Sequence, residues 1–130
     1  MESSGKLIFL VDDDKMILNF LEYVFQSKNG YRILSFFSGE DCISNMHLKP
    51  DLVVLDYILS ENKNEALDGL ETLKKLKSIN KKLPVIVLSG QTDHNSAREL
   101  MKNGAKKILK KNDYFADALE NSIKEELSSK

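Results

Sequence analysis

The stretch Asp51-Leu52-Val53-Val54-Leu55-Asp56 places four consecutive apolar residues, two of them β-branched, between two carboxylates. A short apolar run without helical spacing is typical of a strand buried on both faces, as in the middle of a parallel sheet. The preceding Pro50-Asp51 is a turn signal. Ligands of open α/β sheets bind beyond the carboxyl ends of the strands, so Asp56 stands where an acid serves chemistry better than packing. A lone Asp more often simply opens the next loop, so the other strands decide its significance.

The composition describes an ordinary globular chain of 130 residues, with 42% hydrophobic and 30% charged residues. Nineteen basic and twenty acidic residues leave a net charge of -1, which predicts no partnership with nucleic acid or with an anionic membrane. Cys42 is the only cysteine, so no internal disulfide can form, and a packed side chain is expected there. Without a membrane-length apolar run or a signal-peptide pattern, the expected location is the cytoplasm. We expect one domain over 1–130, with its core at about 6–128 and no output domain.

A second apolar run, from Lys6 to Val11, ends in three acids, Asp12, Asp13 and Asp14. Adjacent carboxylates repel one another, which costs stability unless a cation or a lysine neutralises them. Asp14 can also serve only to cap the helix that follows. Asp12 and Asp13 are therefore the candidate metal ligands in this cluster.

The rest of the chain alternates between helical spacing and short apolar runs. The spacing predicts helices at about 15–27, 38–47, 68–79, 93–103 and 113–128, and the runs predict strands at 31–36, 84–88 and 108–109. The strand at 31–36 is expected nearer an edge of the sheet. The helical residues expected to face inward include Ile17, Phe20, Leu21, Val24, Phe25, Leu70, Leu73, Leu76, Ile79, Ala97, Leu100, Met101, Phe115, Leu119, Ile123 and Leu127.

Five strands alternating with five helices predict an α/β fold with a doubly wound five-stranded parallel sheet. Right-handed crossovers bring the carboxyl ends of all the strands to one edge. The polar residues expected to meet at that edge are Asp12, Asp13, Asp56, Ser89 and Lys111. Oxygen ligands in an open site suit Mg²⁺, and a lysine beside a hydroxyl would bind phosphoryl oxygens. Taken alone, the hydroxyl and the lysine fit an ordinary turn and a solvated surface equally well.

With these residues in view, the sequence resembles the receiver domain of two-component response regulators, a flavodoxin-like (βα)5 fold of the CheY type. The likeness extends from Leu7 to about Leu127. Its motifs are Val11-Asp12-Asp13, Pro50-Asp51-Leu52-Val53-Val54-Leu55-Asp56, Asp68-Gly69, Val87-Leu88-Ser89-Gly90, and Gly104-Ala105 leading to Lys111. Together the motifs are specific, although no single one would be.

The resemblance implies a role for each site residue. Asp56 would be the phosphoacceptor, taking its phosphoryl group from a phosphohistidine of a sensor histidine kinase or a histidine phosphotransfer protein. Ser89 would hydrogen-bond the phosphoryl oxygens. Lys111 would pair with Asp56 before the transfer and with the phosphoryl group afterwards. The implied Mg²⁺ ligands are Asp12 (mostly through water), Asp13, Asp56 and the backbone carbonyl of Ile58.

The function implied is a phosphorylation-controlled binding module, monomeric or weakly dimeric, with an output protein docking on the face of the fourth helix, fifth strand and fifth helix. Catalysis would be limited to self-phosphorylation from a phosphodonor and slow autodephosphorylation. Alternatives are a phosphorelay intermediate that passes its phosphoryl group to a histidine phosphotransfer protein, or a receiver module of a larger hybrid kinase or transcription factor. The intact set of site residues argues against a pseudo-receiver that binds constitutively. A metal-dependent phosphatase of similar fold lacks support, because no second catalytic acid or separate base is found in the motif following Asp56.

The sequence departs from the family pattern around the final lysine. The family usually has a proline after a cis bond where Asn112 stands. It usually has an aromatic residue, which switches rotamer, where Ile108 stands. These departures imply a different final turn and a different coupling between phosphorylation and the output face.

The segment between Asp56 and Gly69 is longer than is usual in the family, with Ser60 where proline is common. The segment 61–65 is predicted to be a mobile insertion beside the site. Ile58 and Gln91 border the expected water path, and we hypothesise that they set the lifetime of the phosphoryl group.

Overall fold

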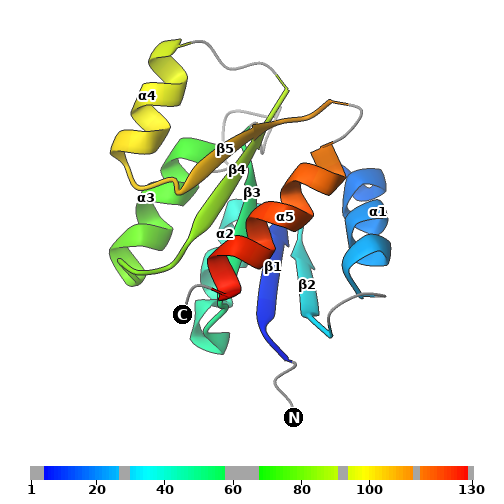
Figure 1. The fold of residues 1–130 in the computed structure, drawn as a ribbon. Coiled ribbons are helices and arrows are strands. Elements are labelled where there is room, and N and C mark those ends of the chain that lie inside the picture. Colours follow the sequence, from blue (N-terminus) through cyan, green and yellow to red (C-terminus); the bar gives the residue numbers. More distant parts are fainter. Residues whose placement is uncertain (1–4, 27–29, 58–67, 91–93, 113–114, 129–130) are drawn as a thin grey trace.

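The structure is a computed structural model that describes residues 5–26, 30–57, 68–90, 94–112 and 115–128. One sheet of five parallel strands has the order β2-β1-β3-β4-β5 (Figure 1). Its strands are β1 (Leu7–Val11), β2 (Arg32–Phe36), β3 (Leu52–Asp56), β4 (Val85–Ser89) and β5 (Lys107–Lys110). The helices are α1 (Lys15–Gln26), α2 (Gly39–Ser44), α3 (Gly69–Ile79), α4 (His94–Lys102) and α5 (Phe115–Ser128), with a 3-10 helix η1 (Met46–Leu48). The predicted doubly wound parallel sheet is confirmed.

The three central strands explain why their sequences are continuous apolar runs. Every residue of β1, β3 and β4 is buried, because helices cover both faces of the sheet at these strands. Strand β3 lies between β1 and β4, with Val53 paired to Phe9 on one side and to Val85 on the other. Strand β2 alternates between exposed and buried positions and lies at one edge, as predicted.

Helices cover the sheet in two groups (Figure 1), and each group closes one apolar core. Helices α2, α3 and α4 pack on one face, with the helical core residues Cys42, Met46, Leu73, Leu76 and Leu100. Helices α1 and α5 pack on the other face, with the helical core residues Leu18, Leu21, Phe25, Leu119 and Ile123. Burial raises the pKa of the Cys42 thiol to about 12, which keeps the thiol protonated and unreactive at neutral pH.

Three helical residues predicted to face inward are exposed instead. Phe20 is 47% exposed, because α1 presents Leu18 and Leu21 to the sheet and leaves Phe20 beside Phe115, with 6.3 Å between ring centroids. Ile79 and Met101 are 52% and 50% exposed, and both lie in the last turn of their helices. The apolar stripes in the sequence are thus wider than the buried faces.

The helix predicted from 38 to 47 ends earlier than expected. Helix α2 stops at Ser44, and the backbone N–H of Asn45 donates to the Cys42 carbonyl at 3.0 Å. The side chain of Asn45 donates to the Asp41 carbonyl at 2.7 Å, which satisfies a carbonyl at the end of α2. The chain then continues as η1.

In the described part of the chain, no helix combines the length and apolar character needed to cross a membrane.

Candidate functional site

Four strand ends meet at the carboxyl edge of the sheet. The register pairs Val11 with Leu55, Asp56 with Leu88, and Ser89 with Lys110. Each strand therefore ends at about the same level, and the residue that follows it emerges at one edge. The four elements deliver Asp12 and Asp13 after β1, Asp56 at the end of β3, Ser89 at the end of β4, and Lys111 after β5.

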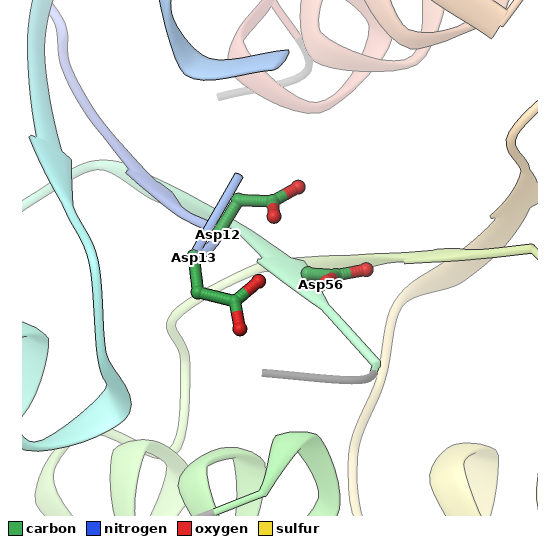
Figure 2. Close-up of side chains that lie close together, drawn as sticks. All are labelled: Asp12, Asp13 and Asp56. Carbon is green, nitrogen blue, oxygen red and sulfur yellow. The ribbon is translucent and has the colours of Figure 1, made fainter. Parts of the chain in front are cut away.

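Three carboxylates gather beside one another at this edge. One oxygen from each of Asp12, Asp13 and Asp56 lies within 4.8 Å of the others. Figure 2 shows the side chains of Asp12 and Asp13 leaving the end of β1 next to the end of β3, where Asp56 lies. Asp12 and Asp56 are only 3% and 6% exposed, whereas Asp13 is exposed. The group therefore opens to solvent on the Asp13 side.

Lys111 supplies the positive charge that faces these acids. Its Nζ lies 2.9 Å from Oδ1 of Asp56 and 3.2 Å from Oδ2 of Asp12. The backbone N–H of Lys111 also donates to the carbonyl of Ser89 at 2.9 Å, which fixes the start of its side chain beside β4. The neighbouring Lys110 is exposed. One ammonium thus bridges two buried carboxylates that come from different strands.

Burial decides the direction of the pKa shift of Asp56, whereas the neighbouring carboxylates decide that of Lys111. The pKa of Asp56 is raised overall from 3.8 to about 6, because burial and the charges of Asp12 and Asp13 outweigh the hydrogen bond and charge of Lys111. Burial by itself would lower the pKa of Lys111, but the hydrogen bond and charge of Asp56, together with Asp12, raise it overall. At neutral pH Asp56 is a carboxylate and Lys111 is an ammonium. Both are partly desolvated, so neither charge would be favoured there without the other.

Ser89 brings a hydroxyl without a partner to the same edge. The residue is 1% exposed, and within the described residues its Oγ has no hydrogen-bond partner. A buried hydroxyl left unsatisfied costs about 1–3 kcal/mol. Such an atom beside Lys111 and the acids is available to donate to an anion that enters the site.

Asp12 is oriented by the backbone as well as by Lys111. Its Oδ1 accepts from the backbone N–H of Asp14 at 2.9 Å, which leaves Oδ2 for Lys111. The Oδ1 of Asp14 in turn accepts from the backbone N–H of Met16 at 2.9 Å, at the start of α1. Asp14 therefore caps the helix, the structural role that the sequence left open for it.

Gly69 lets helix α3 begin directly against the strand that carries Asp56. A Cβ at this position would lie 2.3 Å from the Tyr57 carbonyl oxygen and 2.8 Å from the Asp56 carbonyl oxygen. The Gly69 N–H donates to the Tyr57 carbonyl at 3.1 Å, and Asp68 caps α3 by accepting from Glu71 N. The sequence marked Asp68-Gly69 as a helix start, but it did not reveal this contact.

Several sequence predictions near the site concern residues outside the described ranges. These are the Ile58 carbonyl as a metal ligand, the lifetime role of Ile58 and Gln91, Ser60, and the proposed mobility of 61–65. The two other departures from the family pattern, at Ile108 and Asn112, lie within the described residues. Ile108 is half-buried against the core under α3 and α4, and Asn112 N donates to the Lys110 carbonyl at 3.0 Å. All peptide bonds in the described part of the chain, including the one before Asn112, are trans.

The pairing of Lys111 with Asp12 agrees with the expectation that a lysine neutralises the acids after β1, although the family resemblance named only Asp56 as the partner of Lys111. The strand register explains this contact, because β1 and β3 are neighbours and end at the same level, which places Asp12 next to Asp56.

The three carboxylates form an oxygen-rich group suited to a hard divalent cation. The ammonium and the free hydroxyl form the adjoining half of a site for an anion with several oxygens.

Comparisons with known proteins agree with this geometry. The family model of the response regulator receiver domain matches residues 8–123. The alkaline phosphatase synthesis transcriptional regulatory protein PhoP of Bacillus subtilis is 32% identical over 90 residues, which are 68% of this chain and 35% of that protein. The chain thus spans about a third of the length of this curated relative.

Two solved structures illustrate the likeness of fold. The receiver domain of NtrX from Brucella abortus has a TM-score of 0.81 at 27% identity, covering 95% of this chain and 99% of that one. A CheY-like response regulator receiver domain protein from Methanospirillum hungatei has a TM-score of 0.85 at 22% identity, covering 97% and 96% of the two chains. With its sheet order, its cluster of strand-end residues and a family match over most of its length, the chain belongs to the response regulator receiver domain family.

Proposed function

We propose that this chain is a phosphorylation-controlled signalling module in which Asp56 accepts a phosphoryl group from a phosphohistidine. The donor would be a sensor histidine kinase or a histidine phosphotransfer protein. The observation that carries the proposal is the meeting of Lys111 Nζ with Asp56 Oδ1 at 2.9 Å, beside the buried Oγ of Ser89, which has no hydrogen-bond partner among the described residues. That arrangement suits an anion with several oxygens attached at Asp56.

The transfer itself asks little covalent chemistry of the protein. An Asp56 oxygen forms a bond to phosphorus while the phosphorus–nitrogen bond of the phosphohistidine breaks, and that bond's electron pair stays on the imidazole. The phosphoryl oxygens carry the charge of the transition state, so catalysis depends on alignment and on nearby positive charge. Lys111 supplies such a charge at the acceptor oxygen, and its pairing holds Asp56 ionised for attack.

The acid cluster fits a divalent cation next to the acceptor. Asp12, Asp13 and Asp56 would hold Mg²⁺, with the exposed Asp13 on the open side, and the Ile58 carbonyl is the further proposed ligand. When bound, Mg²⁺ would supply positive charge to the acids and to the incoming phosphoryl oxygens. The protein contributes a rigid frame for that charge, because the carboxylates project from adjacent strand ends.

The added charge is the proposed signal. A phosphoryl group brings roughly -1.5 to -2 charges, and Ser89 and Lys111 are the groups placed to respond to it. Ser89 would turn its unpartnered hydroxyl to a phosphoryl oxygen, and Lys111 would move from Asp56 to the new group. Both residues border the elements α4, β5 and α5, where we propose that an output protein docks.

The wider assignments form part of the same proposal. They are a cytoplasmic location, a monomer or weak dimer, and no enzymatic turnover beyond self-phosphorylation and slow autodephosphorylation. Because the Bacillus subtilis relative is a transcriptional regulatory protein, the exclusion of nucleic acid does not extend to a longer protein that contains this chain.

The test is phosphorylation by a small phosphodonor. Phosphoramidate with Mg²⁺ should add the mass of one phosphoryl group to the wild type and none to Asp56→Asn, as read by intact mass. Asp14→Asn is the matched control, because this neighbouring acid is exposed and an asparagine still caps the helix. Equal labelling of Asp56→Asn, or loss of labelling in Asp14→Asn alone, would reject the assignment. Back-transfer to a histidine phosphotransfer protein would identify the relay alternative.

A further inference from the structure

A second charged feature lies at the opposite, amino end of the sheet. Two adjoining hollows, of about 450 and 300 Å³, lie between the end of α3, the loop before β4, the end of α4 and the start of β5. Lysines dominate their lining, and we call this surface the lysine hollow. Its lysines are Lys74, Lys77, Lys81, Lys82, Lys102 and Lys106.

The lysine hollow concentrates positive charge in a chain that is nearly neutral. It holds six lysines, whereas the whole chain has a net charge of -1. Glu126 is the only carboxylate among the described residues that line either hollow. The hollow lies at the end of β4 away from Ser89, so it is separate from the site around Asp56.

Lys77 forms the fixed centre of this surface. It lines both hollows and is half-buried, and its Nζ donates to the Leu83 carbonyl at 2.7 Å. Its aliphatic chain crosses Gly104, where a Cβ would lie 2.9 Å from Cε of Lys77. Burial lowers the pKa of Lys77, and the charge of Lys106 lowers it further, so the ammonium ions are held at an electrostatic cost. An anion in the hollow would relieve that cost.

Ordinary helix capping explains only part of this arrangement. Lysines in the last turn of a helix complement its dipole, which accounts for Lys77 in α3 and Lys102 in α4. The other four lysines lie outside those turns, and three of them belong to the loops before β4 and β5. Their convergence on one concavity from separate segments is therefore unexplained by local structure.

The chemistry of the lining indicates the kind of ligand. Lysines offer point charges that suit phosphate, and no aromatic residue or arginine lines the described hollows for stacking on a base. The larger hollow is shallow and open to solvent, so a compact anion could approach its several lysines from outside. We propose that the lysine hollow binds a compact oligophosphate, meaning a chain of adjacent phosphate groups, either free or as the triphosphate of a nucleotide.

The test is a titration of ¹⁵N-labelled protein with inorganic tripolyphosphate in the absence of Mg²⁺. Amide shifts are expected around Lys77, Asn103 and Gly104, with an affinity that falls as salt is added. Monophosphate should bind more weakly than tripolyphosphate. Shifts confined to Asp12, Asp56 and Ser89, or equal binding of the two anions, would overturn the proposal. The result does not depend on phosphorylation, so Asp56→Asn should bind tripolyphosphate as the wild type does.

Matched charge removals make the test specific. Lys74→Gln/Lys102→Gln removes two exposed lysines from the hollow, whereas Lys75→Gln/Lys124→Gln removes two exposed lysines outside it. The first pair should weaken binding by about two- to twentyfold, since each exposed ion pair lost changes an affinity by a factor of about 1.5 to 5. An equal loss in both pairs, or none in the first, would refute the site.

Titrations with ATP and with a DNA duplex distinguish a free phosphate chain from a nucleotide and from extended nucleic acid as the ligand. Equal binding of ATP and tripolyphosphate would support recognition of the phosphate chain alone. Binding of ATP without tripolyphosphate would overturn the proposal, because the base would then be the recognised group. Tighter binding of a DNA duplex than of tripolyphosphate would also overturn it, in favour of a surface for extended nucleic acid.

Discussion

The ammonium of Lys111 lies 2.9 Å from the Asp56 carboxylate and 3.2 Å from the Asp12 carboxylate. Both acids are buried, so their charges are tolerated through this one lysine. A buried ion pair is a poor source of net stability, because desolvation of both ions offsets their attraction. The arrangement is better understood as a charged acceptor held ready at the cost of stability.

The first prediction concerns removal of Lys111. Lys111→Met leaves two buried carboxylates facing each other, and we expect a loss of about 3–5 kcal/mol in the free energy of unfolding at pH 7. Urea denaturation without metal measures it. Lys110→Met is the control, because the neighbouring Lys110 is exposed, and its loss should stay within about 0.5 kcal/mol. Equal effects of the two variants would contradict the bridging role of Lys111.

The second prediction follows from the pKa of Asp56, which is raised to about 6. The folded protein holds the Asp56 proton to a higher pH than the unfolded chain, so this group favours folding at low pH. Its contribution is lost as pH rises from about 4 to about 6.5. Relative to Asp56→Asn, the wild type should lose about 1–3 kcal/mol of stability across this range.

Measurement of both proteins by urea denaturation, with a metal chelator present, reports Asp56 and the groups that interact with it, because titrating groups remote from Asp56 cancel in the difference. Lys111 keeps its proton throughout this range, since its pKa is raised above its ordinary alkaline value. A wild type that gains stability over Asp56→Asn between pH 4 and 6.5 would show that pairing with Lys111 outweighs burial.

The third prediction compares two buried hydroxyl groups, that of Ser89 and that of Thr72. Ser89→Ala removes an Oγ without a partner, so the unphosphorylated protein should keep its stability or gain up to about 1 kcal/mol. Thr72→Val is the contrasting control, because Thr72 Oγ1 donates to the Asp68 carbonyl at 2.7 Å, and its loss should cost about 1 kcal/mol. Thermal unfolding compares the two, and a large loss in Ser89→Ala would indicate a hydrogen bond that this account omits.

The fourth prediction separates two glycines near the site. Gly69→Ala places a Cβ 2.3 Å from the Tyr57 carbonyl oxygen, so α3 must shift, with a loss of about 1–3 kcal/mol and slower phosphorylation of Asp56. Gly90→Ala meets nothing within 4 Å and should be nearly neutral in stability. Calorimetry and a phosphoramidate time course measure the two effects. The steric account fails if both substitutions behave alike.

The sequence predicted the fold and the set of strand-end residues because both depend on short-range patterns. Runs such as 52–55, alternating with helical spacing, are typical of a parallel sheet, and right-handed crossovers then bring Asp12, Asp56 and Lys111 to one edge. Helix existence was equally clear, since apolar spacing repeats over several turns.

What the sequence could not predict depends on distances between elements. Phe20 belongs to a regular apolar stripe, yet only the packing angle of α1 decides that it stays exposed. Likewise, the clash that Gly69 avoids lies with Tyr57, twelve residues away, and the lack of a partner for Ser89 is a property of the assembled edge. The lysine hollow was equally unpredictable, because its charges come from four segments that each look like ordinary solvated surface.

The most direct test of the phosphoacceptor assignment is chemical localisation of the phosphoryl group. Protein treated with phosphoramidate and Mg²⁺ is reduced with borohydride, which converts a phosphorylated aspartate to homoserine, and then digested and sequenced by mass spectrometry. The account predicts homoserine at Asp56 alone, and only when Mg²⁺ was present. Homoserine at Asp12 or Asp13 with Asp56 unmodified, or a label on a histidine instead, would contradict it.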